Sequence, residues 1–499
     1  MGRDHLLAID QGTTSTRVVV YDRRLRPVGQ GQREVPPSYP NPGWVEHDPE
    51  ALVGSVGPLV GLALADAGIG PDRLAGIGLT NQRETTVVWD RGTGAAIGPA
   101  LVWQDRRTAP FCESHRDRRA WISERTGLVL DPYFSATKIA WLLDHVPGAR
   151  GRAEGGGLAA GTVDSLLLWH LTGGDRHVTD ATNASRTLLM DLRTLTWADD
   201  LCHFFAVPPA ILPAILPSAG EFGRTRGLDY LPDGLPIAGV AGDQQASLVG
   251  QGCLAAGTAK CTYGTGAFLL AHTGDRPIPS SRGLVTTLAA TLGDGPPQYA
   301  LEGSVFVAGA AVQWFRDGLK AVGAAPEIDP MSEEADPTSE VVFVPALTGL
   351  GAPHWEPDAR GTIFGINRGT TVADLARATL EGVAFQVADL IDAIRADLPA
   401  PLSTLRVDGG MARSDPFLRF QADLLGLPLR RSPQPESTAL GAALLAGLGV
   451  GLFPDPDAAV ALLEDGGRTF DPARDDAWRE STLGRWRRAV STVKAHYRA

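Results

Sequence analysis

The sequence has very few lysines. Among its 45 basic residues only Lys138, Lys260, Lys320 and Lys494 are lysines, and the others are arginines. A phosphate-binding P-loop needs a lysine directly after its glycines, and none of the four has that setting. If the protein binds phosphate, then backbone amides, hydroxyls, arginine and a metal ion must hold it.

The four cysteines show no CxxC pair and no regular spacing. They fit reduced thiols better than a zinc site or a disulfide framework, and therefore predict a cytoplasmic protein. The first residues lack the apolar core of a signal peptide. The longest apolar stretch, residues 439–453, is rich in glycine and alanine and short for a membrane span. We therefore expect no stable membrane anchor.

Dense basic runs are also absent, and the formal net charge is −12. Binding to a nucleic-acid backbone needs a basic face, so the charge argues against nucleic acid as a partner. The 499 residues, 43% of them hydrophobic, suffice for at least two domains with substantial cores. A small molecule is the substrate that these features favour.

Residues 6–22 have the pattern of a β-hairpin with a polar tip. An apolar strand ends at Asp10, a tight turn of small hydroxylated residues follows, and a β-branched strand resumes. Such a turn offers amides and hydroxyls to a phosphate, with a cation beside them. The residues suited to this role are Gly12, Thr13, Thr14, Ser15 and Arg17.

Residues 259–270 repeat this pattern about half a chain later. An apolar strand runs into Gly264, Thr265 and Gly266, and a second apolar strand follows. The repetition predicts two similar domains, each offering a phosphate-binding hairpin to a shared cleft. With the boundary near residue 250, the N-terminal domain comprises residues 1–249 and the C-terminal domain residues 250–499.

Polar residues at two further strand ends indicate a polar ligand. Arg83 and Glu84 lie between two predicted strands, where they can exchange hydrogen bonds with a polyhydroxylated compound. A solvated turn is the alternative interpretation. Asp243 and Gln244 follow another predicted strand, and Asp243 is also a typical helix N-cap. This turn has the composition of a catalytic site.

Several other segments have a structural interpretation. Trp103 and Tyr133 are either core aromatics or walls of a ligand site. The double glycine 409–410 permits close approach of an adenine or a ribose. Residues 438–447 predict a small-residue helix that packs tightly against a partner helix. Residues 179–192 predict a polar loop and hairpin, and residues 324–340 an acidic surface loop.

In their order along the chain, these motifs resemble the FGGY family of sugar and polyol kinases. The segments that carry the resemblance are residues 6–22, 242–247, 259–270, 407–410 and 438–447, and the likeness extends from about residue 6 to about residue 455. The resemblance implies an α/β fold with two actin/hexokinase-like, ribonuclease H-like ATPase domains flanking a central cleft. A homo-oligomer, either a dimer or a tetramer, is expected.

Within this family, residues 8–15, 42–49, 80–86 and 131–135 look like those of the members that phosphorylate glycerol. By this resemblance, glycerol would be bound by Arg83, Glu84, Trp103, Tyr133, Asp243, Gln244 and Phe268. ATP would be bound by Thr13, Thr14, Ser15, Arg17, Thr265, Gly309, Gln313, Gly410 and Ser414. Family members often carry Asn at the position of Ser414, which is a departure from the pattern.

Phosphoryl transfer to an alcohol needs an in-line hydroxyl, an acceptor for its proton and neutralisation of phosphate charge. Asp243 suits the general base, and Asp10 suits Mg²⁺ held through water. The resulting prediction is ATP-dependent conversion of glycerol to sn-glycerol 3-phosphate in glycerol catabolism. One alternative is a kinase for a longer polyol or a ketose. Another is a non-catalytic sensor or scaffold, against which intact Asp10 and Asp243 argue.

Overall fold

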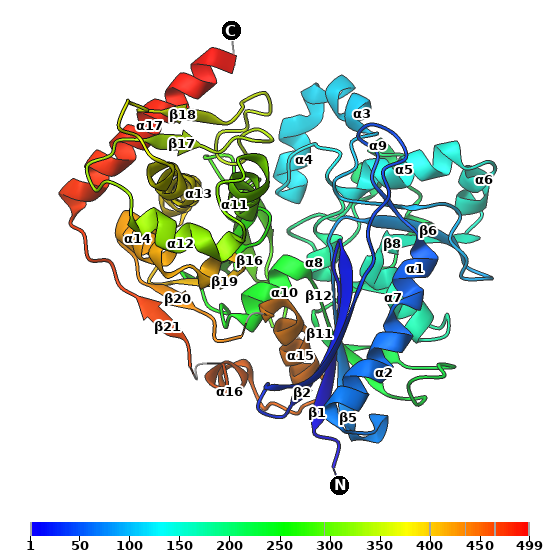
Figure 1. Cartoon of the computed structure of the whole chain (residues 1–499). Helices are drawn as coiled ribbons and strands as arrows, with labels where there is room; N and C mark the ends of the chain where they lie inside the picture. The colour runs from blue at the N-terminus through cyan, green and yellow to red at the C-terminus, as the bar shows by residue number, and fades with distance from the viewer. Residues whose placement is uncertain (1, 294, 399–400, 435, 464–465, 498–499) are drawn as a thin grey trace.

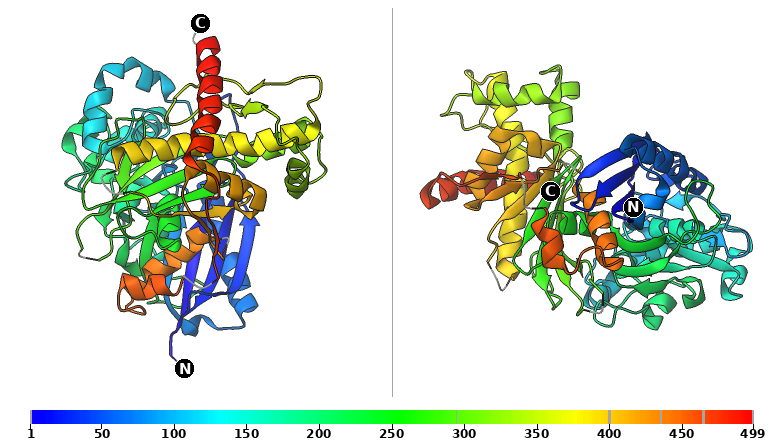
Figure 2. Two further views of the ribbon diagram at one scale, coloured as in Figure 1. Left: turned by 90° about the vertical axis from the view of Figure 1, so that its left-hand side faces the viewer. Right: turned by 90° about the horizontal axis from the view of Figure 1, so that it is seen from below.

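The computed structural model describes residues 2–293, 295–398, 401–434, 436–463 and 466–497, and is built around two mixed β-sheets. The sheets lie in two lobes, formed mostly by the N-terminal and the C-terminal half of the chain (Figure 1). Figure 2 shows the two lobes side by side when the molecule is seen from below.

The first sheet contains the predicted opening hairpin. Its six strands are, in spatial order, β11 (Ala219–Arg224), β12 (Pro236–Gly242), β5 (Leu74–Asn81), β1 (His5–Gln11), β2 (Ser15–Asp22) and β3 (Pro27–Glu34). β1 is antiparallel to β2 and parallel to β5, and β5 is parallel to β12. The hairpin of residues 6–22 is therefore confirmed.

Both faces of β1 are buried, because helices cover the first sheet on both sides. Leu7 and Ile9 pack with α2 (Val56–Ala67) and α7 (Val163–Leu171), whereas Leu6 and Ala8 pack with α15 (Ser437–Gly449). Successive side chains of a strand point to opposite faces, so the uninterrupted apolar run of β1 is what two covered faces require.

One segment, Pro49–Ala67, is long and apolar enough to cross a membrane by length and composition alone. In the structure it forms two helices, α1 (Pro49–Gly54) and α2, which meet at Ser55. α2 contributes Leu59, Val60 and Ala63 to the core beneath the first sheet. α2 is thus a core helix of the first lobe.

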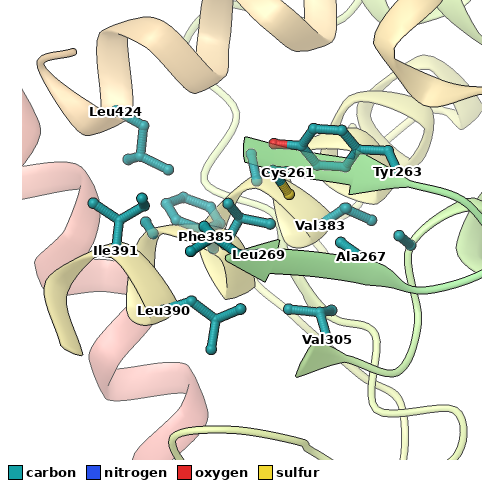
Figure 3. Packing of buried hydrophobic residues seen from close by; sticks show 14 of the residues in the cluster. Cys261, Tyr263, Ala267, Leu269, Val305, Val383, Phe385, Leu390, Ile391 and Leu424 are labelled. Atoms are coloured by element: carbon teal, nitrogen blue, oxygen red, sulfur yellow. The ribbon is translucent and has the colours of Figure 1, made fainter. Parts of the chain in front are cut away.

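The second sheet contains the second predicted hairpin. Its seven strands are β15 (Val285–Leu288), β16 (Tyr299–Val305), β14 (Ala267–Gly274), β13 (Ala259–Tyr263), β19 (Leu405–Gly409), β20 (Leu429–Arg431) and β21 (Arg468–Phe470). β13 and β14 are antiparallel, which confirms the hairpin of residues 259–270. Figure 3 shows Phe385 and Leu390 of α13 (Val372–Asp397) close to Leu269 and Val305 of this sheet.

Smaller elements complete the two lobes. A short sheet of the first lobe consists of β4 (Glu46–His47), β7 (Ala100–Leu101), β6 (Thr86–Asp90) and β8 (Leu158–Thr162). Two strand pairs are β10 (Ala214–Leu216) with β9 (Val178–Asp180), and β17 (Val342–Val344) with β18 (Thr362–Phe364). Further helices are α3 (Ala109–Ser114), α4 (Arg119–Thr126), α5 (Ser135–His145), α6 (Ala149–Glu154), α9 (Asp199–Phe204), α14 (Asp415–Leu425), α16 (Pro456–Ala461) and α17 (Asp476–Tyr497).

Two segments differ from the sequence expectation. Residues 179–192 contain the end of β9 and helix α8 (Ala181–Ala184), because the Asp180 carboxylate accepts hydrogen bonds from the N–H groups of Thr182 and Asn183 and caps the helix. Residues 324–340 contain α12 (Ile328–Glu333), whose Ile328 is buried in the core of the second lobe. The burial of Ile328 favours a helix in this segment, although its acidic composition is typical of a loop.

The predicted small-residue helix, α15, crosses α10 (Asp243–Gly250) between the two lobes (Figure 1). Although α15 belongs to the C-terminal half of the sequence, it covers one face of the first sheet. A Cβ atom on Gly441 would collide with the carbonyl of Ala246, and one on Gly250 with the carbonyl of Ser437. The two backbones are therefore in direct contact, and the predicted tight packing is confirmed.

We predict that Gly441→Ala destabilises the protein even though alanine is the better helix former. Overpacking against the α10 backbone costs ~1–3 kcal/mol, which exceeds the ~1 kcal/mol gained in helix propensity. Gly61→Ala is the matched control, because Gly61 is an exposed glycine of α2 with open space around its Cβ position. Urea unfolding of both variants measures the effect, and equal stabilisation by both would contradict the close crossing.

Candidate active site

The ends of three parallel strands bring predicted site residues to one edge of the first sheet. Asp10 of β1 pairs with Thr80 of β5, and Thr80 pairs with Ala241 of β12. Asp10, Arg83 and Asp243 therefore lie at or just beyond the same edge. Ligands of open α/β sheets bind outside the carboxyl ends of their strands, and this edge is such a place.

The first hairpin presents its small residues at this edge. The Gly12 N–H donates to the Ser15 carbonyl at 3.0 Å, and Thr14 is exposed. The hydroxyl of Thr13 accepts a hydrogen bond from the indole N–H of Trp103 at 2.9 Å. A residue predicted to bind nucleotide and one predicted to bind substrate are thus in direct contact.

Arg17 connects the first hairpin with the C-terminal half. It lies opposite Asp10 in the β1–β2 register, and its guanidinium forms an ion pair with Glu436, the residue before α15. Arg17 also donates to Gln32 Oε1 at 2.8 Å, and Gln32 donates to Ser15 Oγ at 3.2 Å. Arg17 and Ser15 therefore share one polar network with an acid from the other half.

Three residues predicted to bind nucleotide meet at the tip of the second hairpin. The amides on either side of Gly309, at the start of α11 (Gly309–Gln313), donate to the Thr265 carbonyl at 2.8 and 3.1 Å. The Gly309 N–H donates to the Gly264 carbonyl at 2.9 Å. β19 pairs with β13, so Gly410, which follows β19 directly, lies beside the hairpin and has open space around it. This surface permits close approach of a ligand.

The other two predicted nucleotide residues lie nearby with different roles. Gln313 is exposed at the last position of α11. Ser414 caps α14: its hydroxyl accepts from the Phe417 N–H at 3.2 Å and donates to Asp329 at 2.7 Å. The side chain of Ser414 is thus used within the protein.

Arg83 and Glu84 are almost completely buried, which rules out a solvated turn. Arg83 Nε lies 3.3 Å from Asp243 Oδ1 and 3.7 Å from Glu84 Oε1. Glu84 has a φ of 61°, a left-handed conformation that is uncommon for residues other than glycine. Residues held in this way cluster at active sites and ligand clamps.

The two predicted aromatic residues stand together, edge to face, with ring centroids 5.5 Å apart. Trp103 and Tyr133 are both half-buried. The ammonium group of buried Lys138 donates to the Tyr133 carbonyl at 2.7 Å and fixes this turn. The two rings therefore remain partly accessible to a ligand.

Gln244 and Phe268 approach the same region from α10 and β14. Gln244 Oε1 accepts a hydrogen bond from the buried ammonium group of Lys260 at 2.5 Å. In the register of β14 with β16, Phe268 lies on the same face of the second sheet as Glu302, and Glu302 contacts Arg83. Phe268 is thus on the face that meets the first lobe.

Two buried residues that the sequence analysis missed contact Arg83 and Glu84. Arg186 Nε lies 2.6 Å from Glu84 Oε1. Glu302 accepts two hydrogen bonds from Arg83, at 2.6 and 2.9 Å. The sequence signal for Glu302 was a single carboxylate inside an apolar strand, whereas Arg186 stands in a segment without periodicity.

Asp10 and Asp243 concentrate negative charge at the strand ends. Burial and the neighbouring Asp243 raise the pKa of Asp10 to about 7, although Arg17 opposes the shift. Burial also raises the pKa of Asp243, against the influence of Arg83. In the described part of the chain, the Asp10 carboxylate has no hydrogen bond or ion pair. A divalent cation that takes few protein carboxylates, as Mg²⁺ does, fits this arrangement.

Sequence comparison places both halves of the chain in one family. Residues 5–250 match the N-terminal domain of the FGGY family of carbohydrate kinases, and residues 259–450 match its C-terminal domain. The chain belongs to this family. The family and the two-domain α/β kinase fold expected from the sequence are thus confirmed.

Similar proteins match over the full length of the chain. The glycerol kinases of Methylobacterium nodulans and Myxococcus xanthus are 54% and 50% identical to it, covering 98% and 97% of this chain and 98% of each relative. The structure of Plasmodium falciparum glycerol kinase with ADP matches with a TM-score of 0.93 at 37% identity, over 99% of this chain and 98% of that one. Gluconate kinase from Lactobacillus acidophilus matches with a TM-score of 0.88 at 21% identity, over 99% of each chain, which shows the fold alone.

We predict that Asp10→Asn raises the stability of the metal-free protein, and more at pH 8 than at pH 5. The folded state retains the Asp10 proton up to a pKa of about 7, whereas the unfolded chain releases it near pH ~4. Through this group the parent therefore loses stability as the pH rises from about 4 to 7. Thermal unfolding at both pH values measures the difference. An Asn variant less stable than the parent at pH 8 would contradict the raised pKa of Asp10. Added Mg²⁺ should stabilise the parent and so reduce the stability difference between the parent and the variant.

Proposed function

We propose that the protein phosphorylates glycerol with ATP and forms sn-glycerol 3-phosphate in glycerol catabolism. The observation that carries the proposal is the convergence of buried Arg83 and Glu84 with Asp243 and two aromatic rings beside a phosphate-type hairpin. Identity at half or more of the positions to full-length glycerol kinases supports it.

The chemistry of these side chains suits a short polyol. Each hydroxyl donates one hydrogen bond and accepts others, so the Arg83 guanidinium and the Glu84 carboxylate can hold neighbouring hydroxyls. Trp103 and Tyr133 offer apolar ring surface to the carbon chain, and Phe268 offers it from the other half.

ATP would lie between the two hairpins. In this proposal its phosphates are held by amides and hydroxyls of Thr13, Thr14 and Ser15, by Arg17 and by Thr265. The adenosine moiety of ATP contacts Gly309, Gln313, Gly410 and Ser414. Asp10 would hold Mg²⁺ through water, and the ion would supply positive charge that neutralises the phosphates.

Asp243 acts as the general base in the proposed reaction. Its carboxylate accepts the proton of the attacking glycerol hydroxyl, the hydroxyl oxygen forms a bond to the γ-phosphorus, and the bond from that phosphorus to the β–γ bridging oxygen breaks to release ADP. Burial raises the pKa of Asp243, which strengthens it as a proton acceptor. The two halves exclude water, which otherwise competes with glycerol.

An ADP-release assay with glycerol, a tetritol, a pentitol and a ketopentose tests the proposal. We expect the highest kcat/KM for glycerol. A higher value for a longer compound would instead assign the chain to another substrate of the same family. No turnover with any of them would favour a sensor or scaffold.

We predict that Asp243→Asn lowers kcat by ~10²–10⁴-fold, because the amide keeps the shape but loses the proton acceptor. Glycerol and ATP binding, measured by calorimetry, should change little. Asp229→Asn is the control, since Asp229 is an exposed carboxylate outside the site. Turnover of the Asp243 variant within about threefold of the parent would contradict the assignment.

We also propose that the halves 1–249 and 250–499 close on each other when both substrates bind. One phosphate chain can contact both hairpins only if they approach, and the nucleotide supplies most of the differential contacts. Small-angle scattering should give a smaller radius of gyration with glycerol and a non-hydrolysable ATP analogue than without ligands. An unchanged radius, with both ligands shown to be bound, would mean a preformed site.

The assembly and location are part of the same proposal. We expect a homo-oligomer, a dimer or tetramer, whose mass light scattering would give. All four cysteines are free thiols in the structure, which supports a cytoplasmic location.

A further inference from the structure

Four buried side chains form a closed ring of alternating charge where the two halves meet. Glu302 lies 2.6 Å from Arg83 and 3.0 Å from Arg186, and Glu84 lies 2.6 Å from Arg186 and 3.7 Å from Arg83. Each side chain is at most 3% exposed. Three members come from the N-terminal half, and Glu302 comes from β16 of the C-terminal half.

The ring balances two positive and two negative charges. Burial opposes ionisation of Glu302, but Arg186 and Arg83 outweigh it and lower the pKa of Glu302 to about 2. Burial raises the pKa of Glu84, while the two arginines act in the opposite direction. Removing one member would leave an uncompensated buried charge, which is costly.

Glu302 determines which donors of Arg83 remain available. A guanidinium has five N–H donors. Glu302 accepts from both terminal nitrogens of Arg83, and Gln245 Oε1 lies 3.3 Å from one of them. Two donors of Arg83 are not used by Glu302 or Gln245. They are one terminal N–H and the Nε–H, whose nitrogen lies 3.3 Å from Asp243 Oδ1. The edge of Arg83 that faces Asp243 is therefore fixed by a residue from the other half.

We propose that Glu302 is a positioning residue for the polyol substrate. With Arg186, it holds Arg83 and Glu84 in the orientation that binds the hydroxyls, so that substrate recognition depends on the alignment of the two halves. This inference rests on the proposed function, because it assumes that Arg83 and Glu84 bind glycerol.

Glu302→Gln tests the proposal by steady-state kinetics and thermal unfolding. We expect the glycerol KM to rise about tenfold or more, because a charged hydrogen-bond partner of Arg83 is lost, while the ATP KM stays within about twofold. In the double variant Arg186→Gln/Glu302→Gln the ring is neutral again. Its Tm should return toward that of the parent, whereas its glycerol KM should stay high.

Asp389→Asn is the matched control. Asp389 is a mostly buried carboxylate in the second lobe that accepts hydrogen bonds from His354 and Trp486, outside the ring. Its replacement should lower the Tm and leave the glycerol KM unchanged.

The outcomes separate the two proposals. A parent that does not phosphorylate glycerol overturns the proposed function before any variant is compared. An active parent whose Glu302→Gln variant keeps its glycerol KM overturns the positioning role, as does a double variant that recovers glycerol KM together with Tm. If Glu302→Gln does not fold, the double variant with its neutral ring carries the same comparison.

Discussion

The close crossing of α10 and α15 is the constraint on which the geometry of the site depends. Gly250 and Gly441 let the two backbones touch, and the hydroxyls of Ser247 and Ser437 are hydrogen-bonded across the contact at 2.8 Å. α10 begins at Asp243, and α15 begins directly after Glu436, the partner of Arg17. Because helices are stiff, the crossing fixes where these two ends lie relative to the first hairpin. A change in the crossing would move both at once.

In the proposed function, the charged ring contributes more to the orientation of Arg83 and Glu84 than to stability. A buried ion pair seldom stabilises a fold relative to apolar residues of similar volume, because desolvation offsets the attraction. The ring is nevertheless suited to a polyol, whose hydroxyls need donors and acceptors that are already oriented. In the proposed site, Arg83 and Glu84 are held by Arg186 and Glu302. Well-packed apolar residues in place of the four ring members would keep the fold, but they could not bind the hydroxyls of the proposed polyol substrate.

The sequence predicted best those features that depend on residues close together in the chain. The two hairpins and the residues at their tips follow from runs of apolar residues interrupted by small polar ones, and the structure has them in place. Glu302 and Arg186 could not be found in this way, since their partners lie 102 to 219 residues away in the chain. α12 was missed for a similar reason: its acidic composition is typical of loops, whereas the burial of Ile328 in the core of the second lobe is a tertiary contact.

Of the few lysines in the chain, two are buried and form hydrogen bonds inside the protein. The ammonium groups of Lys138 and Lys260 are buried and donate to the Tyr133 carbonyl and to Gln244. Burial lowers the pKa of Lys138 to about 7 and lowers that of Lys260 as well. The hydrogen bonds of both lysines show that they serve as donors inside the protein.

Near the first hairpin, the positive charge of Arg17 is shared with Glu436 and faces Asp10 across the strands. In the proposed site, Arg17 would therefore donate hydrogen bonds to the phosphates but contribute little net positive charge to them. Amides and hydroxyls can orient a phosphate chain, but they do not neutralise it. In the proposed function, the negative charge of Asp10 would then attract Mg²⁺, which would supply the positive charge that the side chains lack.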